Sequence, residues 1–279
     1  MEVKVFQPAD PILKPYIECL YTLKRDANEP PTKYAAFPSI YSMVCMNANS
    51  RIEIEDHDLS FAHDPSTPHQ LSLICDFDTS GWMTYEGAMD EIVIYFKPLG
   101  INAFLEHPLK GYFSSFFTMF DPYADYQESM AEIFELKDNR KRIERLERYW
   151  RSKLKGFEHP FLQQVVDEII RDDFRGSVSD LAMRHGVSRT TLAKHFDQYV
   201  CTTPSQFKKV ARFRSAMRRH RDAVDDLNLS EISHGAEYFD QSHMIKDFKS
   251  LTRLSPKTFF SKLSTLEDGH INWLFDQPA

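Results

Sequence analysis

The sequence predicts a two-domain α+β protein, with a small antiparallel β barrel or sandwich followed by an all-helical domain that contains two helix-turn-helix units. Residues 177–210 repeat about 52 positions later, and short β-type runs fill the first 123 residues. A repeated unit of this size indicates one supersecondary structure used twice. A length of 279 residues also favours two domains.

The first 123 residues carry short apolar, β-branched or aromatic runs separated by turn-forming segments. The runs are 40–46, 71–75 and 91–96, and residues 51–55 alternate apolar and charged side chains. Such runs are typical of strands in an antiparallel barrel or sandwich. We therefore assign residues 1–123 to a first domain.

Residues 124–155 are predicted to be helical and to link the domains. Apolar residues recur between dense charges, as in an amphipathic helix. Its apolar face has two uses: to cover the sheet, which we favour slightly, or to pair with a second copy of the chain. The helical domain then spans residues 156–265.

Residues 266–279 are predicted to form a C-terminal tail. Its two large aromatic residues, Trp273 and Phe275, are expected to dock on the body of the protein, because exposed aromatic surface is unfavourable in water.

Each copy of the repeat predicts two short helices joined by a tight turn. In the first copy, Ser177 and Asp180 form a capping box at a helix N-terminus. Asn228 and Glu231 nearly repeat this pair in the second copy. Gly186 supplies a turn position that tolerates a positive φ.

The second helix of each copy is expected to begin after an N-cap residue, Ser188 or Asp240. Apolar residues four positions apart face inward along these helices: Leu192, Phe196, Met244 and Phe248. Two short helices joined in this way form a helix-turn-helix. The second helix of that motif is the one that enters a DNA major groove.

The two units also carry a specific set of residues. They read Leu181-Ala182-x-x-x-Gly186-x-Ser188-x-x-x-Leu192-x-Lys194-x-Phe196, then Pro204-x-x-Phe207, then Tyr238-Phe239-Asp240-Gln241-Ser242-His243 and Leu254-Ser255-Pro256-x-x-Phe259. This pattern, over roughly residues 158–262, resembles the DNA-binding domain of AraC-type (AraC/XylS) transcription regulators. The resemblance implies a cupin-like sensor fold for the first domain.

The resemblance has departures. Lys194 stands where the family usually has Arg, Ser233 where it has Ala, and Cys201, Glu237 and Arg253 stand where it usually has Gly. If those positions need a positive φ, each replacement of glycine costs about 1 kcal/mol. The departures weaken the inference of family-like DNA affinity.

The resemblance implies a sequence-specific transcription regulator, controlled by a small-molecule effector in the first domain. Double-stranded DNA is the expected partner. RNA polymerase and a second copy of the chain are left open as further partners. We find no signal peptide and no run of 18 apolar residues, so a cytoplasmic protein without a membrane span is expected. The four scattered cysteines fit a reducing compartment.

The net charge of −7 is unevenly distributed. Residues 1–155 carry 17 basic and 24 acidic side chains, whereas residues 156–279 carry 17 of each. Residues 188–219 hold eight basic side chains and one acid, Asp197. A local basic face of this kind is what phosphate contact requires, whatever the total charge. The alternative is a solvated helix face.

Roles on DNA follow from the exposed positions of the predicted recognition helices. Expected base contacts are Arg189, Thr190, Lys194, Gln241, Ser242, His243 and Lys246, because these residue types bond base edges in the major groove. Expected phosphate contacts are Ser188, Lys208, Lys209, Arg212 and Lys257. For Arg212 and Arg214, a structural salt bridge is an equal alternative.

The first domain shows no pattern of catalytic residues. His57, His63 and His69 lack the His-x-His spacing of metal-binding cupins and are interpreted as loop histidines. We therefore expect no enzyme activity, no metal and no cofactor. Aromatic residues are candidates to line an effector pocket, although they equally suit a core: Phe37, Tyr41, Trp82, Tyr85, Tyr95 and Phe96.

Two other classes of function stay open. One is a cupin-like enzyme or small-molecule-binding protein whose C-terminal domain has lost DNA binding. The other is an interaction protein that regulates through partner contacts. Salt-sensitive binding to a defined duplex distinguishes the regulator from both.

Overall fold

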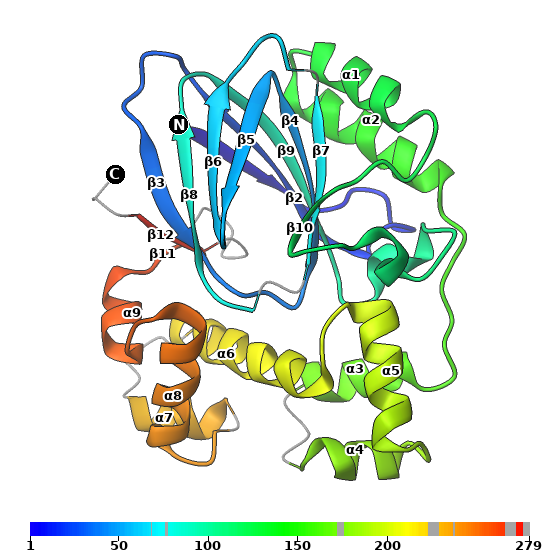
Figure 1. Cartoon of the computed structure of the whole chain (residues 1–279), viewed down its shortest axis with the longest axis vertical. Helices are drawn as coiled ribbons and strands as arrows, with labels where there is room; N and C mark the ends of the chain where they lie inside the picture. Colours follow the sequence, from blue (N-terminus) through cyan, green and yellow to red (C-terminus); the bar gives the residue numbers. More distant parts are fainter. Residues whose placement is uncertain are drawn as a thin grey trace.

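Two β-sheets face each other above a layer of helices (Figure 1). The computed structural model describes residues 1–67, 69–75, 78–171, 176–222, 229–236, 238–265 and 272–275. This arrangement confirms the predicted fold class, a β sandwich followed by an all-helical domain with two helix-turn-helix units.

Each sheet has six strands. In order across sheet A they are β1 (Glu2–Phe6), β2 (Ile17–Arg25), β9 (Met89–Phe96), β4 (Ser42–Ala48), β7 (Gln70–Ile74) and β10 (Phe117–Met119). Across sheet B they are β11 (Ser264–Thr265), β12 (Asn272–Phe275), β3 (Thr32–Ala36), β8 (Gly81–Glu86), β6 (Asp58–His63) and β5 (Ser50–Glu55). The predicted runs 40–46, 51–55, 71–75 and 91–96 lie in β4, β5, β7 and β9.

One pairing departs from the antiparallel prediction. Strands β6 and β8 run parallel, with Leu59 opposite Met83 and Phe61 opposite Tyr85. The remaining strand pairs of the described part are antiparallel. Parallel strands need a long crossover connection, and here the chain between β6 and β8 passes through sheet A as β7.

Alternation along the strands separates two cores. On β9, Val93 faces the space between the sheets, whereas Ile92 and Ile94 face the opposite side. This follows from the period of two in a β-strand. The core between the sheets is rich in tyrosine, and the core on the other face of sheet A is aliphatic and aromatic.

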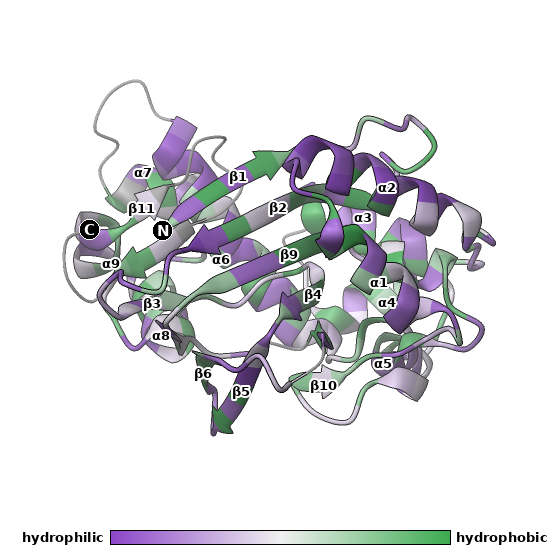
Figure 2. Cartoon of the chain, turned by 90° about the horizontal axis from the view of Figure 1, so that it is seen from above, coloured by the Kyte–Doolittle hydropathy of each residue, from purple (hydrophilic) through white to green (hydrophobic). Residues whose placement is uncertain are grey.

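Two helices cover the outer face of sheet A, α1 (Tyr126–Glu135) and α2 (Asn139–Ser152). Their buried residues, Met130, Ile133, Leu146 and Trp150 among them, pack on that sheet. Figure 2 shows that α2 is largely hydrophilic on the side seen from above. The segment expected to be one amphipathic helix is therefore two, and its apolar face covers the sheet.

Two short 3₁₀ helices lie between the domains, η1 (Gly100–Ala103) and η2 (Leu109–Tyr112). The helical domain contains α3 (Leu162–Ile170), α4 (Val178–Arg184), α5 (Arg189–Val200), α6 (Pro204–Asp222), α7 (Leu229–Gly235), α8 (Gln241–Thr252) and α9 (Pro256–Lys262). No helix of the described residues is long and apolar enough to cross a membrane.

The helical domain packs on the outer face of sheet B. Ala35 and Phe37 share a core with Phe213, Phe248 and Phe259 of the helices. After α9, strand β12 returns to the sandwich and pairs with β3, with Leu274 opposite Ala35 and Phe275 opposite Tyr34. Trp273 is 3% exposed, so the aromatic residues of the tail dock on the body as expected.

Candidate nucleic-acid interface

The first helix-turn-helix unit is built from α4 and α5. Ser177 and Asp180 form the predicted capping box at the start of α4. The Ser188 side chain accepts a hydrogen bond from the Thr191 amide at the start of α5. Gly186 in the turn has a φ of 67°, a conformation that favours glycine. The turn between the two helices is thus the one that the sequence predicts.

The second unit is built from α7 and α8. The Asp240 side chain accepts a hydrogen bond of 2.7 Å from the His243 amide and caps α8. Met244 and Phe248 are fully buried, as Leu192 and Phe196 are in the first unit. Asn228 and Glu237 lie outside the described residues, so the predicted cap of α7 and the departure at Glu237 are not described.

The same end of each recognition helix points away from the sandwich. At the C-terminal end of α5, the Tyr199 carbonyl accepts a hydrogen bond of 2.9 Å from the Asn102 side chain. At the C-terminal end of α8, the Leu251 carbonyl accepts one of 2.8 Å from the Ser80 amide. The N-terminal ends of α5 and α8 therefore lie on the far side of the helical layer, at opposite ends of α6 (Figure 1).

Most of the predicted base-contacting residues are exposed. Arg189, Thr190 and Lys194 are exposed on α5, and Gln241, Ser242 and Lys246 are exposed on α8. His243 is half-buried, and its Nε2 atom lies 3.4 Å from a guanidinium nitrogen of Arg212. The arrangement thus presents polar and basic side chains on the first two turns of both helices, in the N-terminal part with which a recognition helix contacts bases.

The predicted phosphate-contacting residues differ in their surroundings. Lys257 is exposed on the first turn of α9, and Ser188 is exposed at its cap position. The Lys208 side chain donates to the Gly176 carbonyl, and the Lys209 ammonium donates to the Ser250 hydroxyl at 2.6 Å.

Arg212 is the predicted phosphate contact whose position argues against that role. One of its guanidinium nitrogens lies 2.8 Å from the Asp247 carboxylate, and both side chains are largely buried, at 15% and 11% exposure. The guanidinium also lies over the Tyr238 ring, 5.6 Å from its centroid. The structural salt bridge is therefore the alternative seen here, joining α6 to α8. Among the described residues, Arg214 has no carboxylate partner, and it donates to the backbone carbonyls of Phe37 and Pro38.

A groove of about 460 Å³ runs between the two units, with Lys208, His234 and Phe239 in its walls. Phe239 is 92% exposed directly before the N-cap of α8. Neither Phe239 nor His234 was among the predicted DNA contacts. The sequence gave one signal, the position of Phe239 directly before the N-cap residue of a predicted recognition helix. Its exposure could not be predicted, because phenylalanine is usually buried.

Two of the three departures from glycine lie where left-handed backbone is needed. Cys201 and Arg253 end α5 and α8 with φ values of 61° and 62°. The same is true of Leu99 before η1, with a φ of 66°. The condition under which the loss of glycine costs stability is thus met at Cys201 and Arg253.

The aromatic residues proposed for an effector pocket do not lie together. Only Tyr85 and Tyr95 line the cavity between the sheets. Phe96 lies on the opposite face of sheet A, and Phe37 packs on Phe259 with ring centroids 4.9 Å apart. Trp82 packs on the helical domain.

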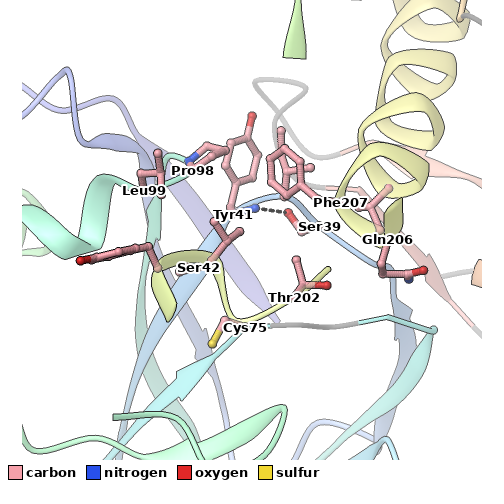
Figure 3. A pocket seen from close by; sticks show the side chains of 13 residues that line it. Ser39, Tyr41, Ser42, Cys75, Pro98, Leu99, Thr202, Gln206 and Phe207 are labelled. Atoms are coloured by element: carbon pink, nitrogen blue, oxygen red, sulfur yellow. Dashed lines mark hydrogen bonds between the residues drawn. The ribbon is translucent and has the colours of Figure 1, made fainter. Parts of the chain in front are cut away.

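Tyr41 lies at the junction of the domains. Figure 3 shows it beside Ser39 and near Phe207 of α6, around a small cavity of about 20 Å³. Of the predicted pocket set, Phe37, Tyr41, Trp82 and Phe96 therefore lie outside the cavity between the sheets. The physical reason is alternation: neighbouring strand residues such as Tyr95 and Phe96 must point to opposite faces.

Comparison with known proteins supports the assignment of the helical domain. Residues 181–262 match a family model described as a helix-turn-helix domain. This match confirms the predicted helix-turn-helix character of the second domain. No curated protein sequence matches the chain.

The solved structures with detectable similarity include several of ToxT from Vibrio cholerae. An apo form of a ToxT variant shares 9% identity and covers 87% of this chain and 97% of that chain, with a TM-score of 0.45. Wild-type ToxT with a bound unsaturated fatty acid shares 12% identity, with coverages of 86% and 92% and a TM-score of 0.44.

Proposed function

We propose that this protein is a sequence-specific transcription regulator whose two helix-turn-helix units read adjacent major-groove segments from one monomer. The observation that carries the proposal is the common direction of α5 and α8. Both present exposed N-terminal turns on the face opposite the sandwich, so the docked first domain leaves them accessible.

The spacing of the units suits this use. The two units lie at opposite ends of α6, which has 19 residues. Such a helix is about 28 Å long at roughly 1.5 Å per residue. A turn of B-DNA spans about 34 Å. The binding site on DNA is then asymmetric, because the outward residues of the two units differ.

We also propose that the first domain controls DNA binding through a small-molecule effector. Its support is the close docking of the two domains, which share a core around Phe37 and Phe259. A ligand that changes sheet B would therefore change the surface on which the DNA-binding helices rest. Regulation, not catalysis, is the role we propose for this domain.

Selection of bound duplexes from a random DNA pool, using the full chain, tests the proposal. We expect an asymmetric motif spanning two groove segments, with affinity that falls as salt rises. Lys194→Ala and Gln241→Ala should each weaken specific binding by about 1–3 kcal/mol and relax preference at different positions.

Lys14→Ala is the matched control, because Lys14 is exposed on the first domain. It removes one positive charge without touching either recognition helix. Equal losses on all sequences for Lys194→Ala and Gln241→Ala would assign these residues to phosphate. No enriched motif would overturn the regulator and favour the small-molecule-binding alternative.

A further inference from the structure

A cavity of about 50 Å³ lies between the inner faces of the two sheets. Glu91 is the one charged residue among its described lining residues. The walls around it are mainly aromatic and include Tyr21, Tyr34, Tyr85, Tyr95 and Trp273. A carboxylate in such a setting needs a physical explanation, because burying a charge is costly unless it is paired.

Glu91 is 2% exposed and is held by neutral donors. The Tyr21 hydroxyl donates to one carboxylate oxygen at 2.6 Å. The Asn47 amide and the Tyr85 hydroxyl donate to the other at 2.7 and 2.9 Å. Three donors aimed at two oxygens match an ionised carboxylate, whereas burial raises the pKa of Glu91.

No cationic side chain of the described residues bonds Glu91. Arg25 is buried in the same sandwich, but it donates to four backbone carbonyls, among them those of Tyr85 and Gly87. The site therefore holds an acid and its hydrogen-bond donors, but lacks the positive partner that a buried carboxylate ordinarily has.

The aromatic residues that line the cavity beside Glu91 suit such a partner. The rings of Tyr34 and Trp273 are stacked with centroids 4.1 Å apart and cover one face of each other, and Tyr21 meets Trp273 edge to face at 6.2 Å. Aromatic faces attract cations, most strongly when the cation is shielded from water, and several such faces around one cation form an aromatic cage. A neutral apolar ligand would leave the Glu91 carboxylate without compensation.

We propose that this cavity binds a small organic ammonium ion, with Glu91 as its counter-ion and the tyrosine and tryptophan rings as its cage. The inference rests on the proposed effector role of the first domain and names the chemistry of the effector. The volume limits its size: at about 10–15 Å³ for each group the size of a water molecule, the cavity has room for roughly three to five heavy atoms.

The site also touches the element that joins the two domains. Trp273 lines the cavity, and Leu274, its neighbour on β12, faces the opposite way into the core shared with the DNA-binding helices. Displacement of Trp273 by a ligand therefore moves a strand whose other face supports those helices. Occupancy of the cage is thereby coupled to the position of the helix-turn-helix units.

Calorimetric titration of the full chain with ethylammonium chloride, at constant ionic strength, tests the proposal. We expect saturable binding by the wild type and a Kd at least tenfold higher for Glu91→Gln. This variant keeps the shape of the side chain. The Asn47 Oδ1 atom has no hydrogen-bond partner among the described residues. If the Asn47 side-chain amide rotates by half a turn, this oxygen can accept a hydrogen bond from the amide group introduced at position 91.

Glu86→Gln is the matched control. It removes the same charge from an exposed position on β8 and should leave the Kd within about twofold of wild type. The wild type should also prefer ethylammonium over ethanol and acetate, a comparison that needs no variant. Equal binding of ethanol, equal binding by Glu91→Gln, or no binding of ethylammonium would overturn the cage.

DNA binding is measured in parallel on the same preparations. Motif selection without ethylammonium binding overturns the cage and leaves the proposed regulator standing. Ethylammonium binding by a protein that selects no DNA motif supports the cage and contradicts the proposed function as a transcription regulator. Cation binding that shifts DNA affinity at least threefold in the wild type, but not in Glu91→Gln, supports both and the coupling through β12.

Discussion

Arg253 closes helix α8 in a left-handed conformation, with a φ of 62°, and its side chain is exposed. Such a conformation costs a residue with a Cβ atom about 1–2 kcal/mol. Glycine removes this strain, but the unfolded chain then has more conformational freedom to lose on folding, which offsets part of the gain. We expect Arg253→Gly to raise the free energy of unfolding by about 0.5–1 kcal/mol, measured by urea denaturation.

The control for this substitution is Lys249→Gly, at an exposed position inside the same helix. Glycine in a helix interior lowers stability by about 1 kcal/mol. The two variants should therefore shift the urea midpoint in opposite directions. A shift of both in the same direction would show that the left-handed position is not strained.

Arg212 and Lys257 were both expected at phosphates, and the structure separates them. Arg212 is largely buried with Asp247, whereas Lys257 is exposed. Arg212→Ala should lower the free energy of unfolding by about 3 kcal/mol, because it removes the arginine partner, 2.8 Å away, of a largely buried carboxylate. Its salt dependence of DNA binding should equal that of wild type.

Lys257→Ala should behave in the opposite way. We expect unchanged stability and a salt-dependence slope that is smaller by about 0.9, the value for one phosphate contact. Denaturation curves and salt titrations of both variants decide the matter. A reduced slope for Arg212→Ala would return Arg212 to the phosphate contacts.

Glu91 predicts a pH dependence of stability that can be isolated by difference. Burial raises its pKa above the ordinary 4.5, so the folded state holds this proton more tightly than the unfolded chain. Its contribution to stability is fully present below about pH 4.5 and is lost as the pH rises through the folded-state pKa.

Relative to wild type, Glu91→Gln should therefore gain stability as the pH rises from about 4.5 through the folded-state pKa of Glu91. The gain is about 1.4 kcal/mol for each unit of raised pKa. Urea denaturation of both proteins at several pH values measures it. A difference that is constant over this range would contradict the raised pKa.

At the scale of single elements, the linker between the domains shows why pattern alone was insufficient. Its apolar residues fit one amphipathic helix, but helix α1 ends at Glu135 and helix α2 begins at Asn139. The Asp138 side chain accepts a hydrogen bond from the Lys141 amide and caps α2. Asp138 was thus a readable N-cap signal, whereas the helices on either side of the turn pack on sheet A through residues such as Ile133 and Leu146.

Buried ion pairing adds to that packing. Arg142 of α2, 3% exposed, makes two hydrogen bonds of 2.7 and 2.9 Å to the Asp90 carboxylate of β9. It also donates to the carbonyls of Phe134 and Leu136 at the end of α1. One guanidinium therefore joins both helices to the sheet. A dense charge run gave no sign that one of its members would be buried.

At the scale of the whole molecule, hydrogen bonds link the two domains. The buried Asn102 side chain donates to the carbonyls of Leu99 and Tyr199 and accepts from the Leu109 amide. It thus links η1 and η2 to the end of α5. Asn102→Ala removes these three side-chain hydrogen bonds and should lower the free energy of unfolding by about 1–3 kcal/mol.

Hydrogen exchange distinguishes a local effect from a loosened interface. For Asn102→Ala, we expect faster exchange along α5 and little change in strands β2 and β9. The control is Asn28→Ala, at an exposed loop position. Asn49 is also exposed, but its φ of 50° makes it unsuitable as a control. Unchanged exchange in α5 would show that Asn102 does not hold the domains together.

The sequence by itself determined the local features of this protein. Helix caps at Ser177, Ser188 and Asp240, the repeat and the alternation of strand residues depend on neighbours a few positions apart, so they can be read along the chain. The left-handed ends at Cys201 and Arg253 were also foreseeable, because the resemblance supplied glycine at those positions.

Only the tertiary structure decided which residues meet across long separations in the chain. The ion pair of Arg212 with Asp247, the donors around Glu91 and the return of Trp273 to the sandwich join residues from separate elements. No local pattern encodes such contacts, since they depend on how whole elements pack to bury apolar surface. For the same reason, six aromatic residues that looked equivalent in the sequence were divided among separate cores.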